Sequence, residues 1–185
     1  MRFKIAVAAL ICALAHTAVA DVADSAASGF TLKIVTQIQA SPADVYKLLV
    51  HNVGDWWNSA HSFSGDAHNL SIEDRPLGCF REKRSGGGGR RHMEVIFAAP
   101  GKLLRMSGGL GPLQGMATAG SMTFAFTPAE GGTKLEVTYA VLGYSAQGMS
   151  ALAAPVNMVL TEQIMRLKSY IETGKPAGGA EPQKK

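Results

Sequence analysis

Glu82 is the residue of this sequence best placed for acid–base chemistry. Pairing the predicted strands 79–84 and 91–98 across the glycine-rich turn between them sets Glu82 opposite Met93, on the same face as Phe80. A carboxyl group on an apolar face has its pKa raised unless a base or several hydrogen-bond donors satisfy it. Glu82 is therefore a candidate general acid or base, or a group that orients a polar part of a ligand. The alternative is a hydrated place at the mouth of a cavity, beside a neighbouring arginine.

Tyr139 and Asn157 are the other polar residues expected to face an interior space. Tyr139 lies on the inner face of the predicted strand 133–141, and Asn157 lies beside Val156 on a predicted helix. The hydroxyl of Tyr139 could act with Glu82 in catalysis, whereas buried tyrosine hydroxyls more commonly bond a nearby carbonyl. No motif specific to one reaction accompanies either candidate, so catalysis stays an open alternative.

The histidines and cysteines do not indicate a metal site. His61 and His68 with Asp66 would be the best zinc set, and an H-x₆-H spacing in a polar loop supports it weakly. His92 is predicted on the solvated face of its strand. Cys79 is the one cysteine outside the N-terminal apolar segment, which excludes an intramolecular disulfide in a mature chain. We therefore predict neither a metal nor a cofactor.

A long C-terminal helix over 146–172 must position these groups. Its apolar residues recur at steps of three and four, which predicts one buried stripe on a helix roughly 40 Å long. Ser145 is the predicted N-cap, and Gly174 followed by Pro176 marks the end. Pro155 lacks an N–H group and should bend the helix near Asn157. The stripe is Met149, Leu152, Val156, Leu160, Ile164, Leu167 and Ile171.

An antiparallel sheet supplies the partner of that stripe. A first strand is predicted over 30–38, followed by a helix that begins at Ser41-Pro42 and by a short segment at Trp56-Trp57. Six further strands alternate apolar and polar residues between Gly and Pro turns, so that each has one buried face. In the last hairpin this places Phe124 opposite Val137. These strands are 69–74, 79–84, 91–98, 102–108, 119–127 and 133–141.

The N-terminal segment is typical of a secretory signal. Arg2 and Lys4 precede an apolar run, and Ala18-Val19-Ala20 forms an A-x-A cleavage site before Asp21. We expect residues 1–20 to be removed, 21–28 to form a flexible arm, 29–174 one domain and 175–185 a disordered tail. The predicted location is therefore the periplasm or the exterior. Residues 1–20 hold two of the 18 basic residues and none of the 14 acidic ones, so the mature chain has a net charge of +2. That charge does not indicate a nucleic acid partner, and no later apolar run predicts stable membrane insertion.

Four local motifs resemble the START-like superfamily, also called SRPBCC, which has the helix-grip fold. They look like the polyketide cyclase/dehydrase-like and chaperone-ATPase-activator-like branches, over residues 30–173. The resemblance implies an α+β fold in which a curved antiparallel sheet of about seven strands wraps a long C-terminal helix, with two short helices after the first strand. It also implies a cavity, which members of the superfamily have in common, but no particular reaction, because they share no catalytic signature. The loop 108–115 looks like that of exported members. The motifs are Ser41–Tyr46 with Asp55–Trp57, Leu77–Glu82, Pro100–Arg105 and Gly131–Tyr139.

The sequence thus predicts an exported domain that binds a small, largely apolar ligand between its sheet and its long helix. A cyclase/dehydratase-type or hydrolase-type enzyme using Glu82 and Tyr139 is one alternative, and a protein-interaction module with a filled core is another. No residue pattern points to a particular protein partner. The predicted ligand-binding residues are Phe30, Leu32, Trp57, Phe80, Glu82, Met93, Met122, Phe124, Val137, Tyr139, Met149, Val156 and Asn157.

Overall fold

The computed structural model describes residues 19–178 of the chain. Most of the predicted signal segment and of the predicted tail therefore lie outside the described residues. The elements in chain order are β1 (Val19–Ala26), β2 (Gly29–Ile38), α1 (Pro42–His51), α2 (Val53–Trp56), η1 (Ser59–His61), η2 (Ala67–Asn69), β3 (Leu70–Ile72), β4 (Cys79–Lys83), β5 (Gly89–Ala99), β6 (Leu103–Gly108), η3 (Gly111–Gly115), β7 (Thr118–Ala129), β8 (Gly132–Gly143) and α3 (Ser150–Thr173).

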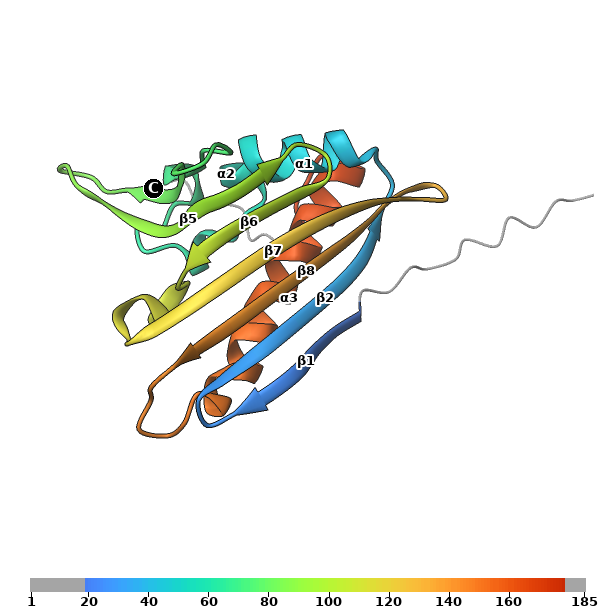
Figure 1. The fold of residues 1–185 in the computed structure, drawn as a ribbon. Coiled ribbons are helices and arrows are strands. Elements are labelled where there is room, and N and C mark those ends of the chain that lie inside the picture. The colour runs from blue at the N-terminus through green and yellow to red at the C-terminus, as the bar shows by residue number, and fades with distance from the viewer. Residues whose placement is uncertain (1–18, 179–185) are drawn as a thin grey trace, which may run out of the picture.

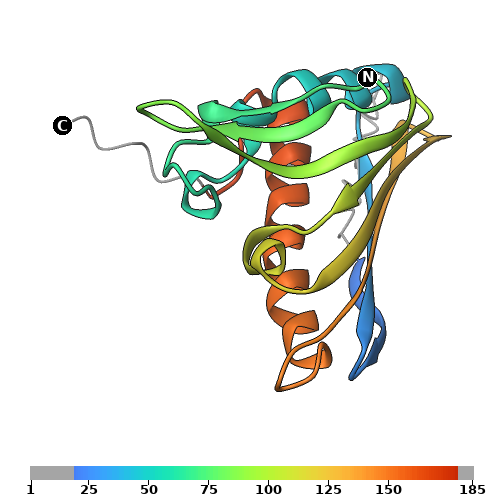
Figure 2. The ribbon, with the colours of Figure 1, turned by 60° about the vertical axis from the view of Figure 1, so that its left-hand side comes forward.

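One antiparallel sheet of eight strands curves around α3 in a helix-grip arrangement. The strand order is β1-β2-β8-β7-β6-β5-β4-β3, so that β2 lies between β1 and the last strand, β8. Figure 1 shows α3 crossing behind the sheet, with α1 and α2 at one end of it. The turned view in Figure 2 shows the sheet bending around the helix. Among residues 19–178, no helix is long and apolar enough to cross a membrane.

The alternation of apolar and polar residues builds the buried face of the sheet as predicted. Buried and exposed side chains alternate along β2, β7 and β8. The predicted register of the last hairpin is confirmed, since Phe124 pairs with Val137 and Met122 with Tyr139. Leu32 pairs with Tyr139 from the other side, which extends the apolar face across three strands.

The long helix begins later than the sequence predicts. Ser145 is not its N-cap: the Ser145 carbonyl accepts the Gly148 N–H in a turn, and Met149 is the residue before the first helical turn. Gly148 has a φ of 79°, a left-handed conformation that ends the preceding loop. No side chain caps this end of the helix, and the Met149 N–H donates to the Ala27 carbonyl, which ties the start of the helix to the turn after β1. The predicted end is confirmed, because Gly174 has a φ of 77° and its N–H bonds the Tyr170 carbonyl.

Residues 21–28 are not a flexible arm. Residues 19–26 form the edge strand β1, whose partners along β2 run from Val35 opposite Val19 to Gly29 opposite Ala26. Only Ala20 and Val22 of β1 pack against the core and the rest of the strand is exposed, so backbone pairing with β2 does more than side-chain burial to hold it in place. The sequence for that reason lacks the alternation by which the other long strands were predicted.

The pairing of β4 with β5 differs from the predicted register and contains a bulge. Phe80 pairs with Met93 and Arg81 with Arg91, so His92 is an extra residue without a partner on β4. Glu82 lies opposite Arg90 rather than Met93. The register is already displaced by two residues at Phe80, which keeps each side chain on its predicted face, and the bulge adds one more residue before Glu82.

Candidate functional site

An apolar hollow of about 460 Å³ lies between α3 and two loops. One loop includes η1 and the other η3, and in Figure 2 η3 lies beside α3. The volume falls within the range of small-molecule pockets. The helix contributes the first half of its apolar stripe, around Pro155. The lining residues are Trp57, Ala60, His61, Ser62, Phe63, Leu110, Gly111, Pro112, Leu152, Pro155, Val156, Val159 and Leu160.

Most of the predicted ligand-binding residues lie in the packed core instead of on the wall of this hollow. Trp57 and Val156 line it. Asn157 is half-buried, and its Oδ1 has no hydrogen-bond partner within the described part of the chain. The other ten have at most 6% of their surface exposed and fill the space between sheet and helix. They are Phe30, Leu32, Phe80, Glu82, Met93, Met122, Phe124, Val137, Tyr139 and Met149.

Glu82 faces inward, as predicted, and its carboxylate holds the loop that contains η1. Its Oε2 accepts the Phe63 N–H at 3.1 Å, and its Oε1 accepts the Ser64 N–H. His92 Nε2 lies 3.1 Å from the same Oε2. Burial raises the pKa of Glu82, but the bonds from Ser64, Phe63 and His92 outweigh it and leave the pKa below its usual value. Glu82 is therefore a charged anchor whose oxygens are occupied by the protein itself.

His92 is buried, and not solvated as the alternating pattern predicts. The bulge turns it to the inner side of β5, where only 6% of it is exposed. Its ring stacks on Phe63 at 5.8 Å between centroids and 17° between planes. Burial lowers the pKa of His92 and Arg90 lowers it further, and together they outweigh the rise that the carboxylate of Glu82 causes. A neutral His92 that donates to a charged Glu82 agrees with the lowered pKa of both residues.

Tyr139 holds the second loop of the hollow in the same manner. Its hydroxyl donates to the Gly108 carbonyl at 3.1 Å and accepts the Leu110 N–H at 3.3 Å. Burial raises the pKa of Tyr139 to about 12, although the Leu110 N–H opposes the rise. The ring lies against Gly120, where a Cβ would be 2.9 Å from Tyr139 Cε2. Glycine at 120 thus permits the ring position that brings the hydroxyl to the loop.

The rim of the hollow carries a polar cluster that joins η1 to α3. His61 Nε2 is 3.1 Å from Glu162 Oε2, and Asn58 Nδ2 donates to Glu162 Oε1. The Asn58 N–H also donates to the side chain of Gln163 at 2.8 Å. Trp57 Nε1 donates to the His61 carbonyl at 3.1 Å and fixes the backbone of η1. Sequence reasoning considered His61 only as a zinc ligand and missed Glu162. The signal available was that Glu162 follows the lining residue Val159 by three positions, at the edge of the helix stripe.

His61 and His68 do not converge on a common centre. His61 bonds Glu162, whereas His68 Nδ1 lies 3.0 Å from Asp66 and its Nε2 3.7 Å from Asp55. Within residues 19–178, no group of three or more histidine, cysteine or acidic side chains is arranged to hold a metal ion.

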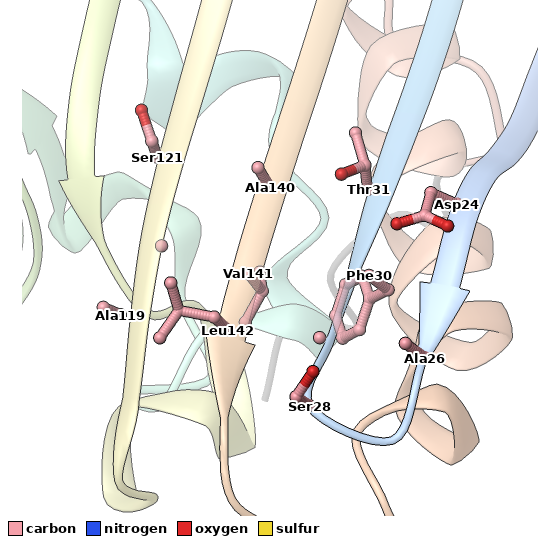
Figure 3. Close-up of a pocket in the computed structure, with 12 residues that line it drawn as sticks. Asp24, Ala26, Ser28, Phe30, Thr31, Ala119, Ser121, Ala140, Val141 and Leu142 are labelled. Carbon is pink, nitrogen blue, oxygen red and sulfur yellow. The ribbon is translucent and has the colours of Figure 1, made fainter.

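A second depression, of about 390 Å³, lies on the opposite side of the sheet (Figure 3). Short side chains on β1, β2, β7 and β8 leave this space, with Ala140 and Ser121 on neighbouring strands and Asp24 at the edge. Leu142 is 64% exposed beside it. The depression is open along the sheet surface, so it is less suited than the first hollow to enclose a small ligand.

Comparison with known proteins supports the fold. No family model and no curated protein matches the sequence. Among solved structures, the chain is similar to a conserved protein of unknown function from Enterococcus faecalis, with 15% identity, a TM-score of 0.58 and coverage of 94% of this chain and 84% of that one. A protein from Mesorhizobium loti gives 19% identity, a TM-score of 0.55 and coverage of 75% and 94%. DynU16, a protein in the dynemicin biosynthetic locus, gives 19% identity, a TM-score of 0.57 and coverage of 79% of this chain and 48% of DynU16.

Proposed function

We propose that this chain is an exported START-like domain that binds a small, largely apolar ligand in the hollow between α3 and the two loops. The observation that supports the proposal is how the two loops that line the hollow are held in place. Glu82 and Tyr139 are both buried. The carboxylate of Glu82 bonds the backbone of the η1 loop and the hydroxyl of Tyr139 bonds that of the η3 loop, and these bonds hold both loops away from the helix. A pre-formed apolar hollow reduces the ordering cost of binding a ligand.

The same contacts weigh against Glu82 and Tyr139 as acid–base groups. A general acid or base must reach the reacting atom of a substrate. The carboxylate of Glu82 already accepts two backbone N–H groups, and the hydroxyl of Tyr139 already donates and accepts once. The core between sheet and helix is filled, as in an interaction module, but the separate hollow is large enough for a two-ring or three-ring compound, which favours a binding domain.

Titration with N-phenyl-1-naphthylamine, a neutral fluorescent probe, tests ligand binding. We expect micromolar affinity in the wild type and a loss of about tenfold or more in Val156→Trp, because Val156 lines the hollow and the indole fills it. Met158→Trp is the matched control: Met158 lies on the same helix, is 70% exposed and does not line the hollow. Equal binding by the two variants, or none by the wild type, would refute the proposal.

Export is supported by the charged start, the apolar run and the A-x-A site of residues 1–20. Expression of the full chain in a Gram-negative host, followed by fractionation and N-terminal sequencing, tests it. We expect a periplasmic protein that begins at Asp21. A cytoplasmic protein that retains Met1 would contradict export and leave the binding proposal intact.

A further inference from the structure

We propose that His61 and Glu162 form a recognition dyad for a hydroxyl group, so that the hollow takes an apolar alcohol or phenol rather than a hydrocarbon or a carboxylic acid. This inference rests on the proposed function, because it assigns the chemical class of the ligand. His61 lies in the wall of the hollow, between Ala60 and Ser62, and a third of its side chain is open.

The neighbours of His61 decide which nitrogen is left for a ligand. Glu162 has an acceptor-only carboxylate, so it selects the tautomer that carries the proton on Nε2, 3.1 Å away. Asn58 donates to the other oxygen of Glu162 and fixes the carboxylate relative to η1. Nδ1 is then a hydrogen-bond acceptor, and within residues 19–178 it has no hydrogen-bond partner.

A free acceptor on a residue that lines an apolar hollow favours a ligand that brings a donor. A hydroxyl group donates to Nδ1 and leaves the rest of the ligand to fill the space beside Trp57, Pro112 and Val156. A carboxylate ligand brings acceptor oxygens and a negative charge toward the negative Glu162. A hydrocarbon makes no use of Nδ1. The arrangement resembles the carboxylate–histidine pairs in which the carboxylate orients the ring for the reacting partner, with the ligand hydroxyl in the partner's place.

Three probes of similar size test this assignment by isothermal titration calorimetry at pH 7.5: 2-naphthol, 2-methylnaphthalene and 2-naphthoate. We expect the wild type to bind 2-naphthol about tenfold more tightly than 2-methylnaphthalene, the size of effect expected of one hydrogen bond. The carboxylate should bind most weakly. His61→Phe should remove the preference for 2-naphthol and leave the affinity for 2-methylnaphthalene within about twofold.

His68→Phe is the matched control, because His68 also pairs with carboxylates but lies outside the hollow; it should keep the wild-type preference. Equal affinity of the wild type for 2-naphthol and 2-methylnaphthalene, tightest binding of 2-naphthoate, or an equal loss of both neutral probes in His61→Phe would overturn the dyad while ligand binding stands. Failure of all three probes and of the fluorescent amine to bind the wild type would overturn the proposed function and this inference with it.

Discussion

At the residue scale, two buried polar side chains on different strands each hold a loop by bonding its backbone. Glu82 on β4 binds the backbone of the η1 loop, and Tyr139 on β8 binds the backbone of the η3 loop. A buried carboxylate stays charged when backbone N–H donors replace the water it loses. The loops therefore owe their positions in part to side chains of the sheet.

Glu82→Gln should lower the free energy of unfolding by about 1–3 kcal/mol, because the amide NH₂ group cannot accept the N–H that one carboxylate oxygen accepts. Urea unfolding at pH 7.5 measures the change. Glu94→Gln on β5 is the control: Glu94 is half-buried and pairs with Arg91 at the surface, so its loss should be within about 0.5 kcal/mol. Comparable losses in the two variants would contradict the anchoring role of Glu82.

His92 should make stability fall as the solution becomes acidic. The pKa of folded His92 is lowered from its ordinary 6.5, so below pH 6.5 the unfolded chain binds a proton that the folded chain does not. Unfolding then takes up a proton, and stability declines by up to about 1.4 kcal/mol per pH unit until the folded pKa is reached. The depressed pKa of Glu82 adds a further loss below its ordinary 4.5.

Urea unfolding at pH 7.5, 6.5 and 5.5 tests the contribution of His92. His92→Phe keeps a ring that can stack on Phe63 and removes the titrating group. The variant should be less stable at pH 7.5 but should show a flatter profile between pH 6.5 and 5.5. A variant as steep as the wild type would assign the acid sensitivity to other groups.

At the element scale, the hydroxyl of Tyr139 helps to fix the η3 loop, together with the side chains of Thr118 and Gln114. Tyr139→Phe leaves the Leu110 N–H and the Gly108 carbonyl without their partner. We expect a loss of about 1–2 kcal/mol and at least tenfold faster hydrogen exchange at the Leu110 amide. Tyr144→Phe provides the comparison, since Tyr144 is 74% exposed. Unchanged exchange at Leu110 in Tyr139→Phe would show that the loop holds its shape without the hydroxyl.

The elements that follow a regular period could be predicted from the sequence, and the irregular ones could not. The alternation on β7 and β8 sets their register, and the stripe of α3 indicates which face meets the sheet. The bulge at His92 breaks the period of β5, and the Met149 N–H is capped by a carbonyl 122 residues away at Ala27. The rim pair His61 and Glu162 is likewise brought together only by the fold. Local patterns contain no information about such long-range pairs.

At the scale of the whole molecule, the N-terminal strand and the C-terminal helix stabilise each other. β1 covers the edge of β2, and the turn after it supplies the Ala27 carbonyl that accepts the Met149 N–H at the start of α3. The Gly143 N–H donates to the Ser28 carbonyl in the same region. The start of the helix that lines the hollow is thus built from both ends of the domain.

Two shortened chains separate β1 from the segment before it. A chain that begins at Asp21 loses only Val19 and Ala20 from β1 and should unfold at nearly the temperature of the full chain. A chain that begins at Ser28 loses all of β1 and the Ala27 carbonyl. It should unfold about 10 °C lower or more, as a loss of several kcal/mol implies, and should aggregate through the uncovered edge of β2. Thermal unfolding by circular dichroism and light scattering measure both effects. If the chain from Ser28 proved as stable and as monomeric as the chain from Asp21, then β1 would be dispensable and the cap of α3 would have to come from the helix alone.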